Sequence, residues 1–257
     1  AKKIGDLEYE SFLNMGNENF IWKRPDDEWQ AISLNYTSGT TGNPKGVVYH
    51  HRGGYLMATG SVTAWNMPNR LNFLYTVPMF HCNGWCYPWT LAMLHARVIC
   101  IRNIRAKEIF ELISEHKITH FGGAPIILNM LANAPKEEQI KLNHKVYVLT
   151  AAAPPPSIIF KKMKELGFEV MHVYGLTETY GHILQCAWNS EWDKLNEDEK
   201  ADISSRQGVR YPNTEDVKVM NPENMKTVPN DGKTIGEIMI RGNVVMKGYF
   251  KDKDATK

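Results

Sequence analysis

The sequence predicts an α/β fold, in which helices cover both faces of a doubly wound parallel sheet and a smaller β-rich subdomain follows. From residue 31 onward, short apolar segments typical of strands alternate with helical segments of about 10–15 residues. After residue 213 the helical pattern gives way to short strands separated by Gly, Pro and Asn. The composition, with 43% hydrophobic and 23% charged residues, is that of an ordinary globular protein.

We divide the chain into an irregular lead-in over residues 1–30, an α/β core over 31–212 and the β-rich subdomain over 213–257. In the core, apolar runs predict strands over 31–36, 46–49, 72–77, 97–101, 118–121, 145–149 and 168–173. Helices are predicted over 51–65, 84–95, 105–117, 126–133, 157–166 and 191–206. Short strands are predicted in the subdomain over 217–220, 235–241 and 244–249.

Local signals justify these elements in turn. Residues 31–36 alternate in polarity, and Pro78 ends the strand over 72–77. In 105–117, Ile109 and Ile113 recur at helical spacing among charged residues. The strongly charged segment 191–206 is predicted to be an exposed helix.

Charge and composition exclude several classes of function. The chain has 30 basic and 28 acidic residues, so its formal charge of +2 gives no electrostatic reason to expect a nucleic-acid or membrane-surface partner. No apolar stretch approaches the roughly 20 residues of a membrane-spanning helix.

The four cysteines are too few for a disulfide-dense scaffold, and three of them lie in apolar surroundings, so we expect buried free thiols in a reducing compartment. Cys82 and Cys86, with His81 and His95 nearby, invite a zinc interpretation. No second cysteine pair follows at ligand spacing, so this interpretation is disfavoured.

The segment from Tyr36 to Gly46 is the most informative part of the sequence. It combines Ser and Thr hydroxyls, glycines whose backbone can approach a phosphate closely, and the charge of Lys45. The spacing excludes a Walker A loop, because Lys45 precedes Gly46 and no second glycine stands directly before the lysine. Composition alone leaves two interpretations open, an anion-binding loop or a solvated turn between strands.

The string T-S-G-T-T-G-N-P-K-G-V resembles the phosphate loop of the adenylate-forming superfamily, which includes acyl-CoA synthetases, luciferases and adenylation domains. The resemblance continues in Tyr174-Gly-Leu-Thr-Glu178 and in the segment from Gly236 to Tyr249. It implies ATP phosphate contacts by Thr37, Ser38, Gly39, Thr40, Thr41, Gly42 and Lys45. It also implies that Thr177 contacts phosphate and that Glu178 ligates Mg²⁺, so that Lys45, Thr177 and Glu178 form the catalytic set.

The resemblance implies that the adenine of ATP lies between two further segments. One is the small-residue loop with Ala152, Ala153 and Pro154, where family members often carry Gly, and the other holds Tyr174 and Gly175. The other interpretation of the alanine loop, a simple strand-to-helix turn, is compatible with this role.

The acid substrate is expected beside His81, Trp85, Gly122 and Gly123. Amino-acid-activating relatives usually place Asp right after the matching Phe, because a buried ammonium group needs a carboxylate partner, and here that residue is His81. The bulky residues around Trp85 favour a short, medium-chain or aromatic acid, although they could also belong to the core.

Residues 80–85, 102–110 and 119–135 resemble the acyl-activating subfamily of plant acyl-activating enzymes and bacterial short- or medium-chain or methylmercaptopropionate CoA ligases. The implied function is an AMP-forming acid–CoA ligase with ATP, Mg²⁺ and CoA as cofactors and co-substrates. Alternatives are a non-catalytic nucleotide-binding fragment, or a luciferase-like or adenylation enzyme acting without CoA. A cytoplasmic location is expected, or a peroxisomal one for a eukaryotic parent.

We also expect the chain to be an internal piece of a longer enzyme that does not complete the reaction alone. It begins at Ala1 without Met and ends at Lys257 in a charged stretch. The resemblance implies a ribose-binding Asp, a hinge and a small C-terminal domain with a lysine, which we expect in the part of the longer enzyme beyond Lys257.

Overall fold

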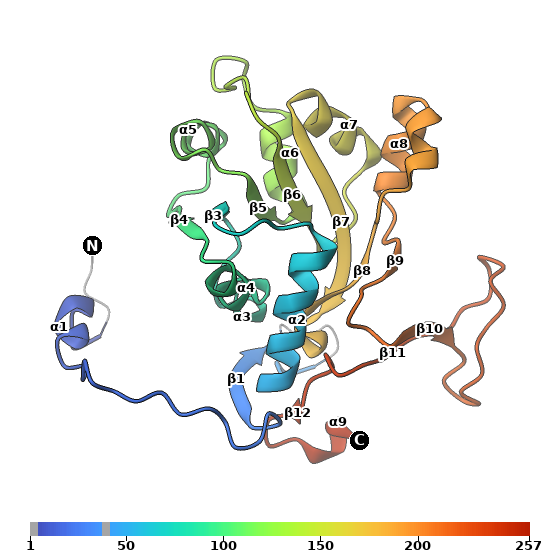
Figure 1. Ribbon diagram of the computed structural model, residues 1–257. Helices are drawn as coiled ribbons and strands as arrows, with labels where there is room; N and C mark the ends of the chain where they lie inside the picture. Colours follow the sequence, from blue (N-terminus) through green and yellow to red (C-terminus); the bar gives the residue numbers. More distant parts are fainter. Residues whose placement is uncertain (1–4, 38–41) are drawn as a thin grey trace.

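A computed structural model describes residues 5–37 and 42–257 and contains one large and two small sheets (Figure 1). The large sheet has the order β4-β3-β5-β6-β7-β8-β9, with parallel pairing from β4 to β7 and antiparallel pairing of β8 and β9. Its strands are β3 (Asn72–Tyr75), β4 (Arg97–Cys100), β5 (His120–Gly123), β6 (Val146–Thr150), β7 (Phe168–Leu176), β8 (Gly181–Gln185) and β9 (Val209–Arg210). The predicted α/β class is thereby confirmed, with an antiparallel edge added to the parallel sheet.

Helices cover both faces of this sheet because successive strand residues point to opposite sides. Leu74 packs with α5, α6 and α7 on one face, whereas its neighbour Phe73 packs with α2 and α4 on the other. The helices are α1 (Tyr9–Leu13), α2 (His51–Ala64), α3 (Cys82–Trp85), α4 (Tyr87–Met93), α5 (Ala106–His116), α6 (Pro125–Ala132), α7 (Ser157–Glu165), α8 (Glu197–Ser204) and α9 (Lys253–Thr256). Two 3-10 turns add η1 (Thr177–Thr179) and η2 (Ser190–Lys194).

Helix α5 illustrates how the predicted pattern becomes structure. Ile109, Phe110 and Ile113 are fully buried on one side, and burying each such side chain contributes about 1.5–3 kcal/mol. The helix ends where Lys117 adopts a left-handed conformation and donates its N–H to the Ile113 carbonyl.

The small sheets lie beside the large one. Strand β2 (Gly46–His50) pairs antiparallel with β1 (Ala31–Tyr36) on one side and with β12 (Gly248–Tyr249) on the other. Strands β10 (Asp216–Met220) and β11 (Glu237–Arg241) form a separate antiparallel pair. Because β12 joins β2, part of the 213–257 segment packs against the beginning of the core; the predicted domain boundaries themselves stay a prediction.

Several predicted elements differ from the structure. The prediction of a single helix over 84–95 is wrong, because Cys86 adopts a left-handed backbone conformation that separates α3 from α4. The helix over 191–206 is divided into η2 and α8, where Asn196 caps α8 by accepting from the N–H groups of Asp198 and Glu199. The strand over 244–249 is reduced to β12, and β8 and β9 were not predicted.

Within residues 5–37 and 42–257, no helix is both long and apolar enough to cross a membrane.

Candidate functional site

The neck of the predicted phosphate loop is closed by two hydrogen bonds. Thr37 donates its N–H to the Lys45 carbonyl over 3.0 Å, and the Lys45 N–H donates to the Thr37 hydroxyl over 3.3 Å. Pairing of Tyr36 with Gly46 continues this closure into β1 and β2. The predicted contacts Ser38, Gly39, Thr40 and Thr41 lie outside the described residues, and Gly42 is exposed.

Lys45 lies beside an aromatic residue from the other end of the chain. Its side chain is exposed, and its Nζ lies 5.0 Å from the centre of the Tyr249 ring. An ammonium group at this distance over a ring face is attracted by the ring's negative quadrupole. This contact holds the lysine near the loop neck without neutralising its charge.

Glu178 is anchored through both its backbone and its side chain. It lies in η1, directly after β7 ends, and its carbonyl accepts the Met246 N–H over 2.8 Å. The Tyr249 hydroxyl donates to Glu178 Oε1 over 2.7 Å. Burial and the neighbouring Glu178 carboxylate raise the pKa of Tyr249 to about 12, so the hydroxyl keeps its proton at neutral pH.

Two tyrosines support the turn that carries Thr177. The Tyr49 hydroxyl donates to the Thr177 carbonyl over 2.7 Å, and the Tyr49 ring stacks on Tyr180 with centroids 3.9 Å apart. The Tyr180 hydroxyl donates to the His50 carbonyl over 3.1 Å. Sequence reasoning gave no role to Tyr49, Tyr180 or Tyr249; only Tyr249 lay in a segment that it singled out.

The predicted adenine-binding residues lie at the carboxyl ends of adjacent strands. Thr150 at the end of β6 pairs with His172 of β7, which brings the following alanine loop near Tyr174. Ala152 and Ala153 are exposed and Tyr174 is half-buried. Ala152 has a φ of 87°, a left-handed conformation that is strained for a residue with a Cβ.

The predicted acid-binding residues follow β3 and form the end of β5. His81 is exposed, whereas Trp85 is 5% exposed and belongs to the core around α4. Gly122 and Gly123 are buried, and a Cβ added to Gly122 would lie 3.1 Å from the Trp85 ring. Trp85 therefore fills the space beside the end of β5.

The donor set around Glu178 fits a magnesium ion shared with a nucleotide. Mg²⁺ is typically bound through one or two carboxylates while substrate phosphates and water supply the remaining oxygens. Over the ranges that the structure describes, no three His, Cys, Asp or Glu side chains gather as a metal site held by protein alone would need.

The thiols of Cys82 and Cys86 are buried, and burial raises the pKa of both. The Cys86 thiol donates to the Tyr180 carbonyl over 3.0 Å.

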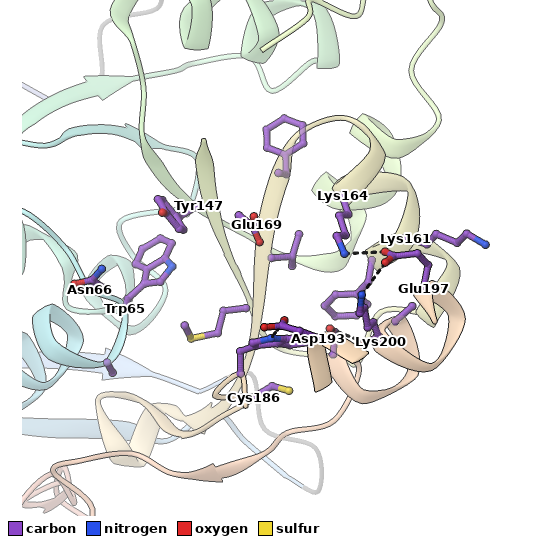
Figure 2. Close-up of a pocket in the computed structure, with 18 residues that line it drawn as sticks. Trp65, Asn66, Tyr147, Lys161, Lys164, Glu169, Cys186, Asp193, Glu197 and Lys200 are labelled. Carbon is purple, nitrogen blue, oxygen red and sulfur yellow. Dashed lines mark hydrogen bonds and ion pairs between the residues drawn. The ribbon is translucent and has the colours of Figure 1, made fainter. Parts of the chain in front are cut away.

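A separate pocket of about 400 Å³ lies between α7, α8 and the first halves of β6 and β7 (Figure 2). Trp65, Tyr147 and Met171 contribute to its apolar wall. At its rim, Lys164 and Lys200 both pair with Glu197, at 2.7 and 3.0 Å. None of the predicted site residues lines it, so it is distinct from the candidate site.

The structure thus brings the loop neck and Glu178 together around Tyr249. The roles assigned to the individual residues remain predictions.

Comparison with known proteins places this geometry in context. The family model described as "AMP-binding enzyme" matches residues 4–250. The whole chain is 53% identical to "Acetate/butyrate--CoA ligase AAE7, peroxisomal" of Arabidopsis thaliana and 51% identical to "Acetate--CoA ligase CCL3" of Humulus lupulus, and it covers 45% of each. It is 45% identical over 97% of its length to "Trans-cinnamate:CoA ligase, peroxisomal" of Petunia hybrida and covers 44% of that protein.

Solved structures share the fold. The inhibitor-bound N-terminal domain of FACL13 from Mycobacterium tuberculosis superposes with a TM-score of 0.75 at 26% identity, over 93% of this chain and 56% of that one. O-succinylbenzoate coenzyme A synthetase (MenE) from Bacillus subtilis, in complex with ATP and magnesium, has a TM-score of 0.75 at 24% identity, over 90% and 45% of the two chains. The chain therefore spans about half the length of the proteins that it matches.

Proposed function

The chain belongs to the AMP-binding enzyme family, and from this premise we propose that the protein containing it is an AMP-forming acid–CoA ligase. In the first step a carboxylate oxygen attacks the α-phosphorus of ATP, and the bond to pyrophosphate breaks to give acyl-AMP. In the second step the CoA sulfur attacks the acyl carbon, its proton is lost and AMP leaves. The relatives named as CoA ligases support this assignment.

The observation that carries the proposal is the convergence of Lys45 and Glu178 on Tyr249. A cation from the loop and a carboxylate from η1 contact the same side chain, one at its ring and one at its hydroxyl. A polyphosphate with a divalent cation needs this pair of opposite charges at short range. A non-catalytic nucleotide-binding protein could use the same pair, so turnover decides between the two functions.

Each residue has a defined task in this scheme. Lys45 neutralises phosphate charge at the loop, and the Thr177 hydroxyl donates to a phosphate oxygen. Glu178 holds the cation, and Mg²⁺ when bound supplies charge neutralisation between the phosphates. Tyr174, with Ala152, Ala153 and Pro154, forms the surface for adenine. Positioning and electrostatics then provide most of the rate increase.

We propose a short acid as the substrate, with medium-chain and aromatic acids as alternatives. Trp85 fills the space beside Gly122, which leaves little room for a long chain on that side. His81 stands where an amino-acid-activating enzyme would need a carboxylate, so an amino acid is disfavoured. Relatives named for acetate and butyrate support a short acid, whereas the relative named for trans-cinnamate supports an aromatic one.

The test is exchange of labelled pyrophosphate into ATP by the intact protein, measured with a panel of acids from acetate to octanoate, cinnamate and amino acids. We expect exchange that depends on a carboxylic acid, and a loss of at least about a hundredfold in Lys45→Ala and Glu178→Ala. Lys161→Ala is the matched control, because Lys161 pairs with Asp198 beside the separate pocket. Exchange without any acid dependence, or unchanged exchange in both site variants, contradicts the proposal.

Two further expectations complete the proposal. Residues 1–257 alone are proposed not to form acyl-CoA, and robust acyl-CoA formation by this piece would refute that. A cytoplasmic or peroxisomal location is proposed, and two of the relatives carry "peroxisomal" in their names. Imaging of the tagged intact protein in its own cells distinguishes the two compartments.

A further inference from the structure

We propose that Tyr249 is a positioning residue that orients the Glu178 carboxylate for a magnesium–nucleotide complex. This inference rests on the proposed function and adds a residue to the same site. The Tyr249 hydroxyl donates to Glu178 Oε1 over 2.7 Å, a short hydrogen bond to a charged acceptor. A single donor at Oε1 fixes the rotation of the carboxylate without occupying both of its oxygens. The carboxylate therefore meets the cation already oriented.

Tyr249 can do this because its own backbone is fixed from both sides. In β12, Gly248 pairs with Val48 and Tyr249 pairs with Val47, two residues beyond Lys45. The Phe250 N–H donates to the Gly46 carbonyl over 2.6 Å. On the other side, the Tyr249 N–H donates to the Thr256 hydroxyl over 2.9 Å. The ring thus has a defined place beside the loop neck.

The same segment also contacts the turn that carries the carboxylate. The Met246 N–H donates to the Glu178 carbonyl over 2.8 Å, three residues before the tyrosine whose hydroxyl binds the side chain. Residues 246–250 therefore connect η1 to β2 through main-chain hydrogen bonds. This connection holds the main chain of η1 close to β2, the strand that directly follows Lys45.

The ring and the hydroxyl of Tyr249 have separable tasks. The ring faces Lys45 Nζ at 5.0 Å, and the hydroxyl contacts Glu178. Tyr249→Phe removes only the hydroxyl and keeps the ring for Lys45. Tyr249→Leu removes both. The pair of variants therefore separates orientation of the carboxylate from placement of the lysine.

The experiment measures equilibrium binding of ATP to the intact protein by calorimetry, with excess Mg²⁺ and with EDTA. In Tyr249→Phe we expect affinity in EDTA to stay within about twofold of wild type. We expect the gain in affinity on adding Mg²⁺ to fall about tenfold, or about 1.4 kcal/mol. In pyrophosphate exchange, the Mg²⁺ concentration for half-maximal rate should rise while kcat at saturating Mg²⁺ stays within about threefold.

Three comparisons make the result specific. In Glu178→Gln, adding Tyr249→Phe should have no further effect on the Mg²⁺ gain, because the two residues act as a unit. Tyr55→Phe, on an exposed tyrosine of α2, should leave both affinities unchanged. Tyr249→Leu should also weaken binding in EDTA. The thermal unfolding midpoint of Tyr249→Phe is measured to confirm that the variant is folded.

An unchanged Mg²⁺ gain in folded Tyr249→Phe overturns the inference, and so does an equal loss of affinity with and without Mg²⁺, which indicates a structural role. Either result in a wild-type protein that shows acid-dependent exchange contradicts this inference alone. Absence of acid-dependent exchange in the wild type contradicts the proposed function instead.

Discussion

Replacing Gly53 by alanine should destabilise the protein, although alanine is normally the better helix residue. Gly53 lies in the first turn of α2, and a Cβ there would lie 2.3 Å from Cζ and 2.6 Å from the hydroxyl oxygen of Tyr180. The Tyr180 ring cannot easily move away, because it stacks on Tyr49 and exchanges hydrogen bonds with the His50 backbone.

The size of the effect follows from two opposing terms. Overpacking a buried site costs about 1–3 kcal/mol, and the short approach to a fixed ring places Gly53→Ala near 3 kcal/mol. The gain in helix propensity returns about 1 kcal/mol. We therefore expect the free energy of unfolding to fall by about 2 kcal/mol. Because Tyr180 follows η1 directly, binding of Mg²⁺–ATP should weaken as well.

The neighbouring glycine provides a matched control. A Cβ on Gly54 would lie 3.4 Å from the Trp89 ring, which is ordinary contact. Gly54→Ala should therefore keep or raise stability by about 0.5–1 kcal/mol. Urea unfolding of both variants, followed by circular dichroism, gives the comparison. Equal stability of the two variants would refute the steric argument.

Three further predictions follow from other parts of the molecule. Ala152→Gly should raise the free energy of unfolding by about 1 kcal/mol in urea unfolding, because it removes the strain of a left-handed alanine; a loss of stability contradicts this. Burial lowers the pKa of His120 and of His182 to about 4 from an ordinary value of 6.5, so the folded state binds fewer protons than the unfolded state. The free energy of unfolding should be constant above about pH 6.5 and fall towards pH 4, by up to about 3 kcal/mol for each histidine. Urea unfolding of His120→Phe at pH 7 and at pH 5 should show a smaller fall than that of the wild type. Trp85→Leu should shift pyrophosphate exchange towards longer acids, whereas an unchanged acid preference would place Trp85 in the core alone.

Local patterns predicted most of the large sheet. In β6, Val146 and Val148 face one cluster of helices and Leu149 faces the other, as expected for a strand buried on both sides. The family resemblance inferred from the loop and from Tyr174–Glu178 is confirmed by the family model that matches residues 4–250. These features could be predicted from the sequence because each depends on residues that lie close together in it.

Features that depend on contacts between residues far apart in the sequence could not be predicted. Cys86 divides α3 from α4 without a Gly or Pro at its position, and its thiol donates to the carbonyl of Tyr180, 94 residues away. The pairing of β12 with β2 joins segments 200 residues apart, such as Gly248 and Val48. No local pattern contains either contact. The sequence therefore predicted roles for Lys45 and Glu178 but none for the tyrosine between them.

These distant contacts explain why stability and function are linked in this site. Lys45 directly precedes β2 of the three-stranded sheet, and Glu178 lies in η1 between β7 and β8 of the large sheet. Their separation therefore depends on how these two sheets pack. The packing layer includes Tyr49 and Tyr180, both fully buried, and the hydroxyl of Tyr249 spans the same junction at the surface. A substitution that displaces this layer should therefore weaken Mg²⁺–ATP binding even when it contacts no ligand. One that leaves the layer in place, as Gly54→Ala does, should alter stability alone.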